Sequence, residues 1–277
     1  MIKSPPKVMT FSATDPSGGA GLQADVLTIS SLGCHPVSIA TGFTVQDTIG
    51  VNKLISIDSE IVNDQARLIL EDMEVEIFKL GVLGGKENIA AIAEIISDYP
   101  DTPLIIDPVL ASGRGDEFAD IEARNMMIDL LFPKSLLITP NSLEARQLVS
   151  NGEELSDLSI EACVDRFKEM GCENILITGT HENTEKVINT LYSSSNQITP
   201  YHWDRLPGSY HGSGCTLTSA ISAYYALGLS IGEAIEEAQH FTWQTLKNAF
   251  KPGMGQLIPN RFFRANDVED DEKFTHH

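Results

Sequence analysis

Basic residues are scarce in this sequence, which has 19 lysines and arginines against 39 aspartates and glutamates, and a formal net charge of -20 at pH 7. Nucleic acids and anionic membranes are bound by positively charged protein surface. We therefore expect neither of them as a partner. Part of the acidic surplus lies in residues 266–272, so we expect a single domain over 1–265 and a solvated, disordered tail over 266–277.

Long apolar runs are also missing. No stretch approaches the roughly 18 apolar residues that span a membrane, and the N-terminal residues lack the apolar segment of a secretory signal. These absences favour a cytoplasmic protein. The cysteines form none of the close pairs that mark zinc or thiol-redox motifs, since Cys34, Cys163, Cys172 and Cys215 are widely spaced.

Several common catalytic signatures are absent as well. The sequence has no Gly-x-x-x-x-Gly-Lys-Ser/Thr motif and no Gly-x-Gly-x-x-Gly at its first apolar run, so P-loop and dinucleotide-binding interpretations lose support. The segment Gly212-Ser213-Gly214 is not a Gly-x-Ser-x-Gly elbow. His211 is adjacent to it but has no evident acidic partner, so a hydrolase is not supported either.

The sequence does contain short apolar runs that alternate with segments of helical spacing. Runs rich in β-branched residues predict strands buried on both faces, and their alternation with helices predicts an α/β fold, a mainly parallel sheet with helices on both faces. Residues 187–192 and 197–203 predict an antiparallel pair, and no repeat or linker favours a second domain. We expect the other strands at 8–12, 37–41, 53–57, 77–80, 104–107, 136–139 and 175–178, and helices at 21–32, 60–73, 86–97, 121–131, 142–148, 160–170, 213–226 and 231–249.

Ligands of an open parallel sheet bind at the carboxyl ends of its strands, so the loops after the predicted strands are candidates for a site. The first loop contains Gly18, Gly19 and Gly21, which allow the backbone to approach a ligand closely before a helix begins. Asp25 falls on the first turns of that helix, where it can face the pocket as a hydrogen-bond acceptor. The alternative is an ordinary tight turn between strand and helix.

Two carboxylates and an amide stand near the ends of the fifth and sixth predicted strands. Asp107 ends the fifth strand, and Asn141 and Glu144 follow the sixth. Their oxygens are ligands suited to Mg²⁺ or its waters, which a nucleoside triphosphate requires. Each segment alone has a simpler explanation, because Asp-Pro is an ordinary strand terminator and Asn141 with Glu144 can cap the next helix. Their position at adjacent strand ends favours the metal site.

The segment 210–217 runs directly into a predicted amphipathic helix. Gly212, Ser213 and Gly214 leave backbone N–H groups free to point at an anion, and the helix dipole favours negative charge there. This pattern predicts an anion hole for a phosphoryl group in transfer. Cys215 lies within it, and a thiol at a helix N-terminus is expected to have a lowered pKa. The alternative is a structural thiol at a close-packed helix start.

Together, these segments resemble the hydroxymethylpyrimidine/phosphomethylpyrimidine kinases of thiamine biosynthesis. The matching residues are 15–25, 79–83, 107–109, 139–145 and 211–217, and they keep the family's order between about residue 8 and residue 250. The resemblance implies a ribokinase-like three-layer sandwich that uses ATP and Mg²⁺ and commonly forms homodimers. It also implies the reaction, phosphorylation of 4-amino-5-hydroxymethyl-2-methylpyrimidine and then of its monophosphate.

The resemblance also assigns roles to individual residues. Cys215 stands where most ribokinase-like enzymes place an aspartate base, and this substitution is typical of the pyrimidine kinases. Asp107 and Glu144 would organise Mg²⁺. Gln46 would offer the paired donor and acceptor that an aminopyrimidine edge requires. The other residues assigned to the pyrimidine are Gly19, Asp25, Val82 and Val109, and those assigned to the ATP phosphates are Asn141, Thr178, Gly179, Thr180 and His211.

Three departures from the family pattern matter. The strand that in many relatives ends Lys-Gly-Gly-His ends here Thr178-Gly179-Thr180-His181, so an expected phosphate-binding lysine is missing. Asp47 stands where Asn is frequent, and the loop after the fifth strand reads Ala-Ser-Gly-Arg-Gly-Asp over 111–116. We expect Arg114, a catalytic candidate on this glycine-flanked loop, to close over the phosphates and supply the missing charge.

Two other functions stay open at this point. A pyridoxal or pyridoxine kinase acts on a hydroxymethyl group of a similar ring, although its usual aspartate in the anion-hole loop differs from Cys215. A pyrimidine-binding protein without transfer activity would keep the pocket, which the missing lysine allows.

Overall fold

The computed structural model describes residues 4–111, 118, 120–150 and 154–265. These residues form one nine-stranded sheet with the strand order β3-β2-β1-β4-β5-β6-β7-β8-β9. The strands are β1 (Lys7–Thr14), β2 (His35–Gln46), β3 (Val51–Ser56), β4 (Ile77–Leu80), β5 (Leu104–Ile106), β6 (Leu137–Ile138), β7 (Ile175–Ile177), β8 (Lys186–Tyr192) and β9 (Ile198–Asp204).

The sheet is parallel at its centre and antiparallel at both edges. Strands β2, β1, β4, β5, β6 and β7 run parallel, whereas β3, β8 and β9 each pair antiparallel with a neighbour. The mainly parallel sheet and the antiparallel pair in the last third are therefore confirmed. Strand β3 turns back on β2 because the loop between them is too short for a crossover, which needs a dozen or more residues.

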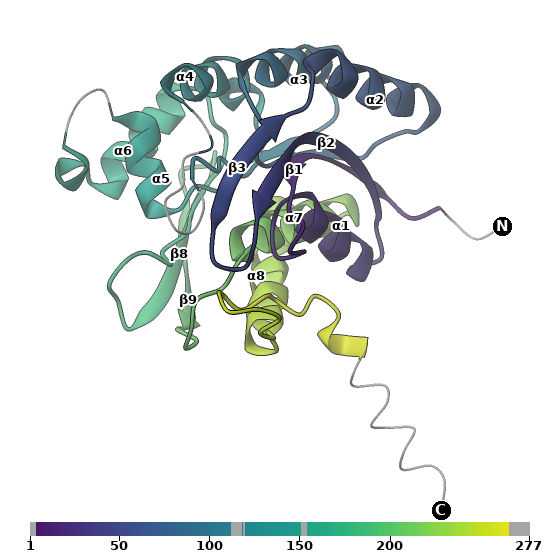
Figure 1. The fold of residues 1–277 in the computed structure, drawn as a ribbon. Coiled ribbons are helices and arrows are strands. Elements are labelled where there is room, and N and C mark those ends of the chain that lie inside the picture. Colours follow the sequence, from purple (N-terminus) through teal and green to yellow (C-terminus); the bar gives the residue numbers. More distant parts are fainter. Residues whose placement is uncertain (1–3, 112–117, 119, 151–153, 266–277) are drawn as a thin grey trace, which may run out of the picture.

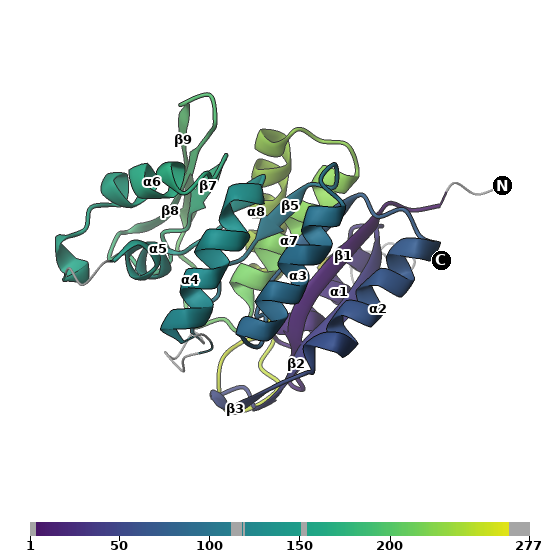
Figure 2. The same cartoon turned by 90° about the horizontal axis from the view of Figure 1, so that it is seen from above.

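Helices cover both faces of the sheet, as predicted. Figures 1 and 2 show α2, α3 and α4 on one face and α1, α7 and α8 on the other. None of the helices within the described ranges combines the length and the apolar character needed to cross a membrane. The helices are α1 (Gly21–Ser31), α2 (Ser59–Asp72), α3 (Lys86–Asp98), α4 (Ile121–Leu130), α5 (Ser142–Val149), α6 (Ile160–Glu169), α7 (Ser213–Ala226) and α8 (Ile231–Lys247), with short 3-10 turns at Phe132–Lys134 and Leu155–Asp157.

The central strands contribute to two cores, one on each face. On β4, Phe78 and Leu80 pack into the core under α2 to α6, whereas Ile77 packs into the core under α1, α7 and α8. Successive side chains of a strand point to opposite faces, so a strand covered on both faces needs apolar residues at consecutive positions. This explains why the sequence shows continuous apolar runs without polar alternation. Because the central strands run parallel, their carboxyl ends lie at one common edge of the sheet.

Candidate active site

A cavity of about 770 Å³ opens at the carboxyl ends of the central strands. Its lining runs along the sheet from Gln46 on β2 to Trp203 on β9, and it includes the first turn of α7. The structure thus brings together segments that are far apart in the sequence, from Ala13 to Gln256. The predicted site residues that line this cavity are Gln46, Val82, Asp107, Val109, Asn141, Glu144, Thr178, Thr180, His211, Gly212, Ser213, Gly214 and Cys215.

Asp25 does not line the cavity, which corrects the expectation of a direct contact with the pyrimidine. Its side chain has no exposed surface, and both carboxylate oxygens lie 2.9 Å from Lys79 Nζ. Thr10 and Ser219 each donate a further hydrogen bond to the same carboxylate. A carboxylate that is enclosed and bonded in this way has no free acceptor to offer to a ligand.

Gly19 and Gly179 also lie outside the cavity lining and pack against protein instead. A Cβ atom on Gly19 would overlap the ring of His211, and one on Gly179 would overlap the backbone carbonyl of Ile188. Both glycines are therefore required for close packing of the loops behind the site. Arg114 lies outside the described residues, so its place relative to the cavity stays a prediction.

The segment predicted to form an anion hole lies at the start of α7. Gly212 is the N-cap of α7 with φ of 80°, a left-handed conformation that favours glycine, and no side chain in the described part of the chain caps the helix. Its Cα packs so closely on the backbone of Gly19 that a Cβ atom would overlap the Gly19 carbonyl. The first N–H groups of α7, without a side-chain acceptor, therefore open into the cavity beside Ser213 and Gly214, where they can bind an anion.

Cys215 is not the low-pKa thiol that its helix-terminal position suggested. Burial and the nearby Asp107 carboxylate together raise its pKa to about 12, although Lys79 acts in the opposite direction. The dipole of α7 favours a thiolate, but the low-dielectric surroundings and the neighbouring negative charge outweigh it. At neutral pH the sulfur is therefore a thiol.

Asp107 and Glu144 face the cavity as two closely spaced carboxyl groups. Burial raises the pKa of Asp107 to about 6, with Lys79 opposing it, and burial together with the Asp107 charge raises the pKa of Glu144 to about 8. Asp107 Oδ2 is buried and has no hydrogen-bond partner among the described residues. Two such carboxyl groups fit a cation, because it would supply the missing partner and offset their mutual repulsion.

Asn141 and Glu144 also form the capping box that the sequence offered as an alternative. The Asn141 side chain accepts from the Leu143 and Glu144 N–H groups, each at 2.9 Å, and Glu144 Oε2 accepts from the Asn141 N–H at 2.9 Å. One Glu144 oxygen is thus used at the helix start. Asn141 and Glu144 therefore cap α5 and also line the cavity, because α5 begins at the carboxyl end of β6.

Two buried cations near the site, Lys79 and Arg261, were not predicted from the sequence. Lys79 gave a signal, because a lysine within the apolar run of β4 requires a buried partner. Arg261 gave none. Its guanidinium donates to the carbonyls of Gly18 and Gly19 and to the Thr216 hydroxyl, and so ties the C-terminal segment to the first loop and to α7.

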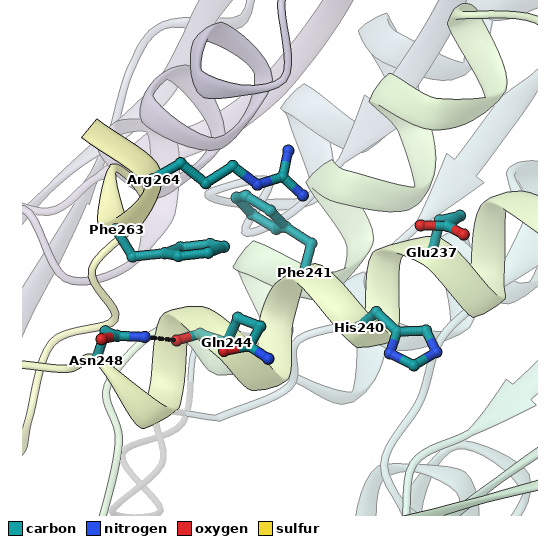
Figure 3. Close-up of a pocket in the computed structure, with 7 residues that line it drawn as sticks. All are labelled: Glu237, His240, Phe241, Gln244, Asn248, Phe263 and Arg264. Atoms are coloured by element: carbon teal, nitrogen blue, oxygen red, sulfur yellow. Dashed lines mark hydrogen bonds between the residues drawn. The ribbon is translucent and has the colours of Figure 1, made fainter. Parts of the chain in front are cut away.

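A second, smaller cavity of about 420 Å³ lies along α8, away from the strand ends (Figure 3). The Arg264 guanidinium lies over the rings of Phe241 and Phe263 there. None of the predicted site residues that the structure describes lines this cavity, so we do not assign the phosphoryl chemistry to it. Its lining residues are Glu237, His240, Phe241, Gln244, Asn248, Phe263 and Arg264.

Comparison with known proteins identifies relatives along most of the sequence. A family model described as phosphomethylpyrimidine kinase matches residues 15–260. The hydroxymethylpyrimidine/phosphomethylpyrimidine kinase of Mycobacterium leprae is 33% identical over 259 residues, 91% of this chain and 92% of that protein. A thiamine biosynthesis bifunctional protein of Geobacter sulfurreducens is 32% identical over 264 residues; the match covers 95% of this chain and 54% of that longer protein, so the chain spans about half its length.

Solved structures of related kinases share the fold. The pyridoxal kinase of Staphylococcus aureus in complex with ADP has a TM-score of 0.83 at 26% identity, and the match covers 94% of each chain. The phosphomethylpyrimidine kinase of Clostridium difficile has a TM-score of 0.74 at 29% identity, with 87% of this chain and 99% of that chain covered. These matches confirm the ribokinase-like fold. Since the family model spans most of the sequence and identity to its kinases reaches 33% over nearly full length, the chain belongs to the phosphomethylpyrimidine kinase family.

Proposed function

We propose that the chain transfers the γ-phosphoryl group of ATP to 4-amino-5-hydroxymethyl-2-methylpyrimidine, and then a second phosphoryl group to the monophosphate. The observation that carries this proposal is the turn at Gly212, whose helix N-terminus opens beside Cys215 into the cavity that also contains Asp107 and Glu144. Relatives at 32–33% identity carry the names of both kinase activities. Phosphoryl transfer depends mainly on positioning and charge stabilisation, which this arrangement can provide.

The pyrimidine is proposed to bind at the β2 and β4 end of the cavity. Gln46 presents an amide there, and Val82 and Val109 provide apolar surface. An amide supplies one acceptor and two donors, which match the ring nitrogen and exocyclic amine of an aminopyrimidine edge. ATP then occupies the other end of the lining, toward β7 to β9, so that its terminal phosphate meets the turn at Gly212.

Asp107 and Glu144 are the residues proposed to hold Mg²⁺. No group of three or more histidine, cysteine or acidic side chains suited to a metal occurs in the described part of the chain. This is compatible with Mg²⁺, which often binds one or two carboxylates and completes its shell with substrate phosphates and water. When bound, the ion supplies positive charge that offsets the charge of the phosphates.

Cys215 is proposed to orient the acceptor alcohol as a neutral thiol. A thiol with a pKa of about 12 is a hydrogen-bond donor at neutral pH, not a strong base. It can therefore align the hydroxymethyl oxygen with the phosphoryl group bound at the turn. In the second phosphorylation the acceptor is a phosphate that is already ionised, so the two steps should depend differently on the thiol.

Positive charge is sparse in the cavity. Among its described lining residues, Arg205 is the one arginine and there is no lysine. The Arg205 guanidinium donates to the carbonyls of Thr180, Glu182 and Thr184, so it stabilises the loop after β7. With Thr178 in place of a lysine, the proposed sources of charge for the phosphates are Mg²⁺ and Arg114.

Pyridoxal is a second candidate acceptor. Solved pyridoxal kinases from two species match this fold with a TM-score of 0.83. A turnover assay with purified protein, Mg-ATP and each of the three acceptors tests both candidates, with products identified by mass spectrometry. We expect diphosphate from the pyrimidine and from its monophosphate. Transfer to pyridoxal alone would contradict the proposal in favour of the second candidate, and binding without any product would indicate a pyrimidine-binding protein.

We also propose that the chain acts as a single domain and as a homodimer in the cytoplasm. Homodimers are common in the family that the motifs resemble. Analytical ultracentrifugation at assay concentration measures the oligomeric state, and a monomer at full activity would contradict the dimer.

A further inference from the structure

Lys79 and Asp25 form an ion pair that is fully enclosed beneath the candidate active site. Lys79 Nζ lies 2.9 Å from both carboxylate oxygens, and neither side chain is exposed. Lys79 stands on β4 and Asp25 on α1, so the pair joins the sheet to the helix that follows the first glycine loop. An apolar pair of similar volume is often at least as stable as a buried ion pair. Stability alone therefore does not explain these two charges.

The Asp25 carboxylate also reaches the helix that carries the anion hole. Ser219 Oγ donates to Asp25 Oδ1 over 2.7 Å, and the Ser219 side chain is completely buried. Ser219 lies four residues after Cys215 on α7. Residues four apart share one face of a helix, so Asp25 holds the same face of α7 that presents the sulfur.

The charge of Lys79 acts on the reacting end of the cavity as well. It opposes the burial that raises the pKa of Asp107 and that of Cys215. A cation fixed below both groups keeps their environment less negative than the acidic residues alone would make it. Asp25 acts on the same two groups in the opposite direction, so the charges of the pair partly offset each other and the hydrogen bond to Ser219 is the main connection to the site.

We propose that Lys79 and Asp25 are positioning residues that hold the first turns of α7, and with them Cys215 and the anion hole, against the acceptor through Ser219. The inference rests on the proposed kinase function and gives Asp25 a role without substrate contact. Positioning of this kind matters because a misplacement of about 1 Å can reduce a rate about 100-fold.

The chain offers a matched pair of variants for a test. Thr10 Oγ1 donates to Asp25 Oδ2 over 2.5 Å, and Thr10 is as buried as Ser219, but it stands on β1 and not on α7. Thr10→Val and Ser219→Ala each remove one hydroxyl from the same carboxylate. We expect Ser219→Ala to lower kcat about tenfold or more, with the KM for ATP within about twofold of wild type. Thr10→Val should keep kcat within about twofold at a comparable loss of Tm.

Two variants test the role of the Lys79 charge: the single variant Lys79→Met, and the double variant that combines it with Asp25→Asn. Lys79→Met leaves an unpaired buried carboxylate, so we expect losses of Tm and kcat. The double variant removes both charges, yet its amide oxygen can still accept from Ser219, so kcat should recover toward wild type together with Tm. Equal kcat losses in Ser219→Ala and Thr10→Val, or a double variant that regains Tm but stays as slow as Lys79→Met, would overturn the inference. An inactive wild-type protein would instead contradict the proposed function.

Discussion

His211 Nε2 lies 2.9 Å from Asp15 Oδ2, and this contact joins the two glycine-rich loops that form the floor of the site. Asp15 also accepts from the N–H groups of Ser17 and Ala20, so one buried carboxylate organises the whole first loop. Burial raises the pKa of Asp15, but the hydrogen bonds from His211, Ser17 and Ala20 outweigh it and leave the pKa below its usual value. His211 therefore has the acidic partner that the sequence did not reveal, far away in the chain.

This contact predicts coupling between the two loops. His211→Ala and Asp15→Ala should each lower kcat/KM, because either change frees the turn at Gly212 from the first loop. In a double-mutant cycle the combined loss should be smaller than the sum, with a coupling energy of about 0.5–3 kcal/mol. Additive losses would show that the two residues act independently. His181→Ala, which changes another histidine that lines the cavity, is the control.

Cys215→Ala should reduce the first phosphorylation by about 100-fold or more, because the acceptor alcohol loses its hydrogen-bond donor. Nucleotide affinity should change little. Cys215→Ser restores a donor and should recover part of the rate, and the second phosphorylation should be less sensitive. Cys172→Ala, a buried thiol in the core under α6, controls for the loss of sulfur as such. Comparable turnover in Cys215→Ala and wild type would refute a catalytic role.

The raised pKa of Cys215 also has a chemical consequence. With a pKa of about 12, the thiol should react slowly with iodoacetamide at neutral pH, and the rate should rise about tenfold for each pH unit. Bound ATP should slow the labelling of Cys215, because this residue lines the cavity in which the nucleotide is proposed to bind. Mass spectrometry of the labelled peptide measures both effects; rapid labelling at neutral pH would show a thiolate.

Glu144 should make the nucleotide-free protein less stable as the pH rises. Its folded-state pKa is raised from 4.5 to about 8, so its contribution to stability is complete below about pH 4.5 and is lost as the pH rises through 8. Glu144→Gln keeps an oxygen for the Asn141 N–H and does not titrate. The Tm of the variant relative to wild type should therefore increase between about pH 5 and pH 8. Glu60→Gln, near the exposed start of α2, is the control for the loss of one carboxyl group elsewhere in the chain.

Tryptophan fluorescence should report nucleotide binding. The chain has 2 tryptophans, and both Trp203 and Trp243 line the cavity, with ring centroids 6.4 Å apart. A non-hydrolysable ATP analogue should change the emission, whereas the pyrimidine alone should change it less, because Gln46 lies near the opposite edge of the sheet. Trp203→Phe and Trp243→Phe identify the reporting ring. A larger response to the pyrimidine would reverse the proposed orientation of the two ligands.

Arg114→Ala should lower turnover about tenfold or more, because the described cavity lining contains no lysine for the phosphates. The loss should appear with ATP at saturation if the guanidinium acts in the transition state. Arg67→Ala, on α2 and paired with Asp98, is a control for the loss of an arginine far from the cavity. Wild-type rates in Arg114→Ala would show that the loop is a surface turn.

The sequence by itself determined the α/β architecture, and it predicted candidate site residues at the strand ends, most of which the structure brings together around one cavity. These features depend on local patterns: continuous apolar runs for β4 and β5, glycines before α7, and the Asn141 and Glu144 pair that begins α5. Recognisable chemistry at strand ends is enough to predict a site, because a parallel sheet gathers those ends at one edge.

Only the tertiary structure decided how each group is used. Asp25 looked like a ligand-facing carboxylate, but Lys79, 54 residues away, encloses it. The position of Cys215 at a helix N-terminus predicted a lowered pKa. In the folded chain, burial and Asp107 raise the pKa instead. Burial and contacts between distant segments decide which groups are charged and which hydrogen-bonding atoms remain available to a ligand. The spacing of neighbouring residues in the sequence does not contain this information.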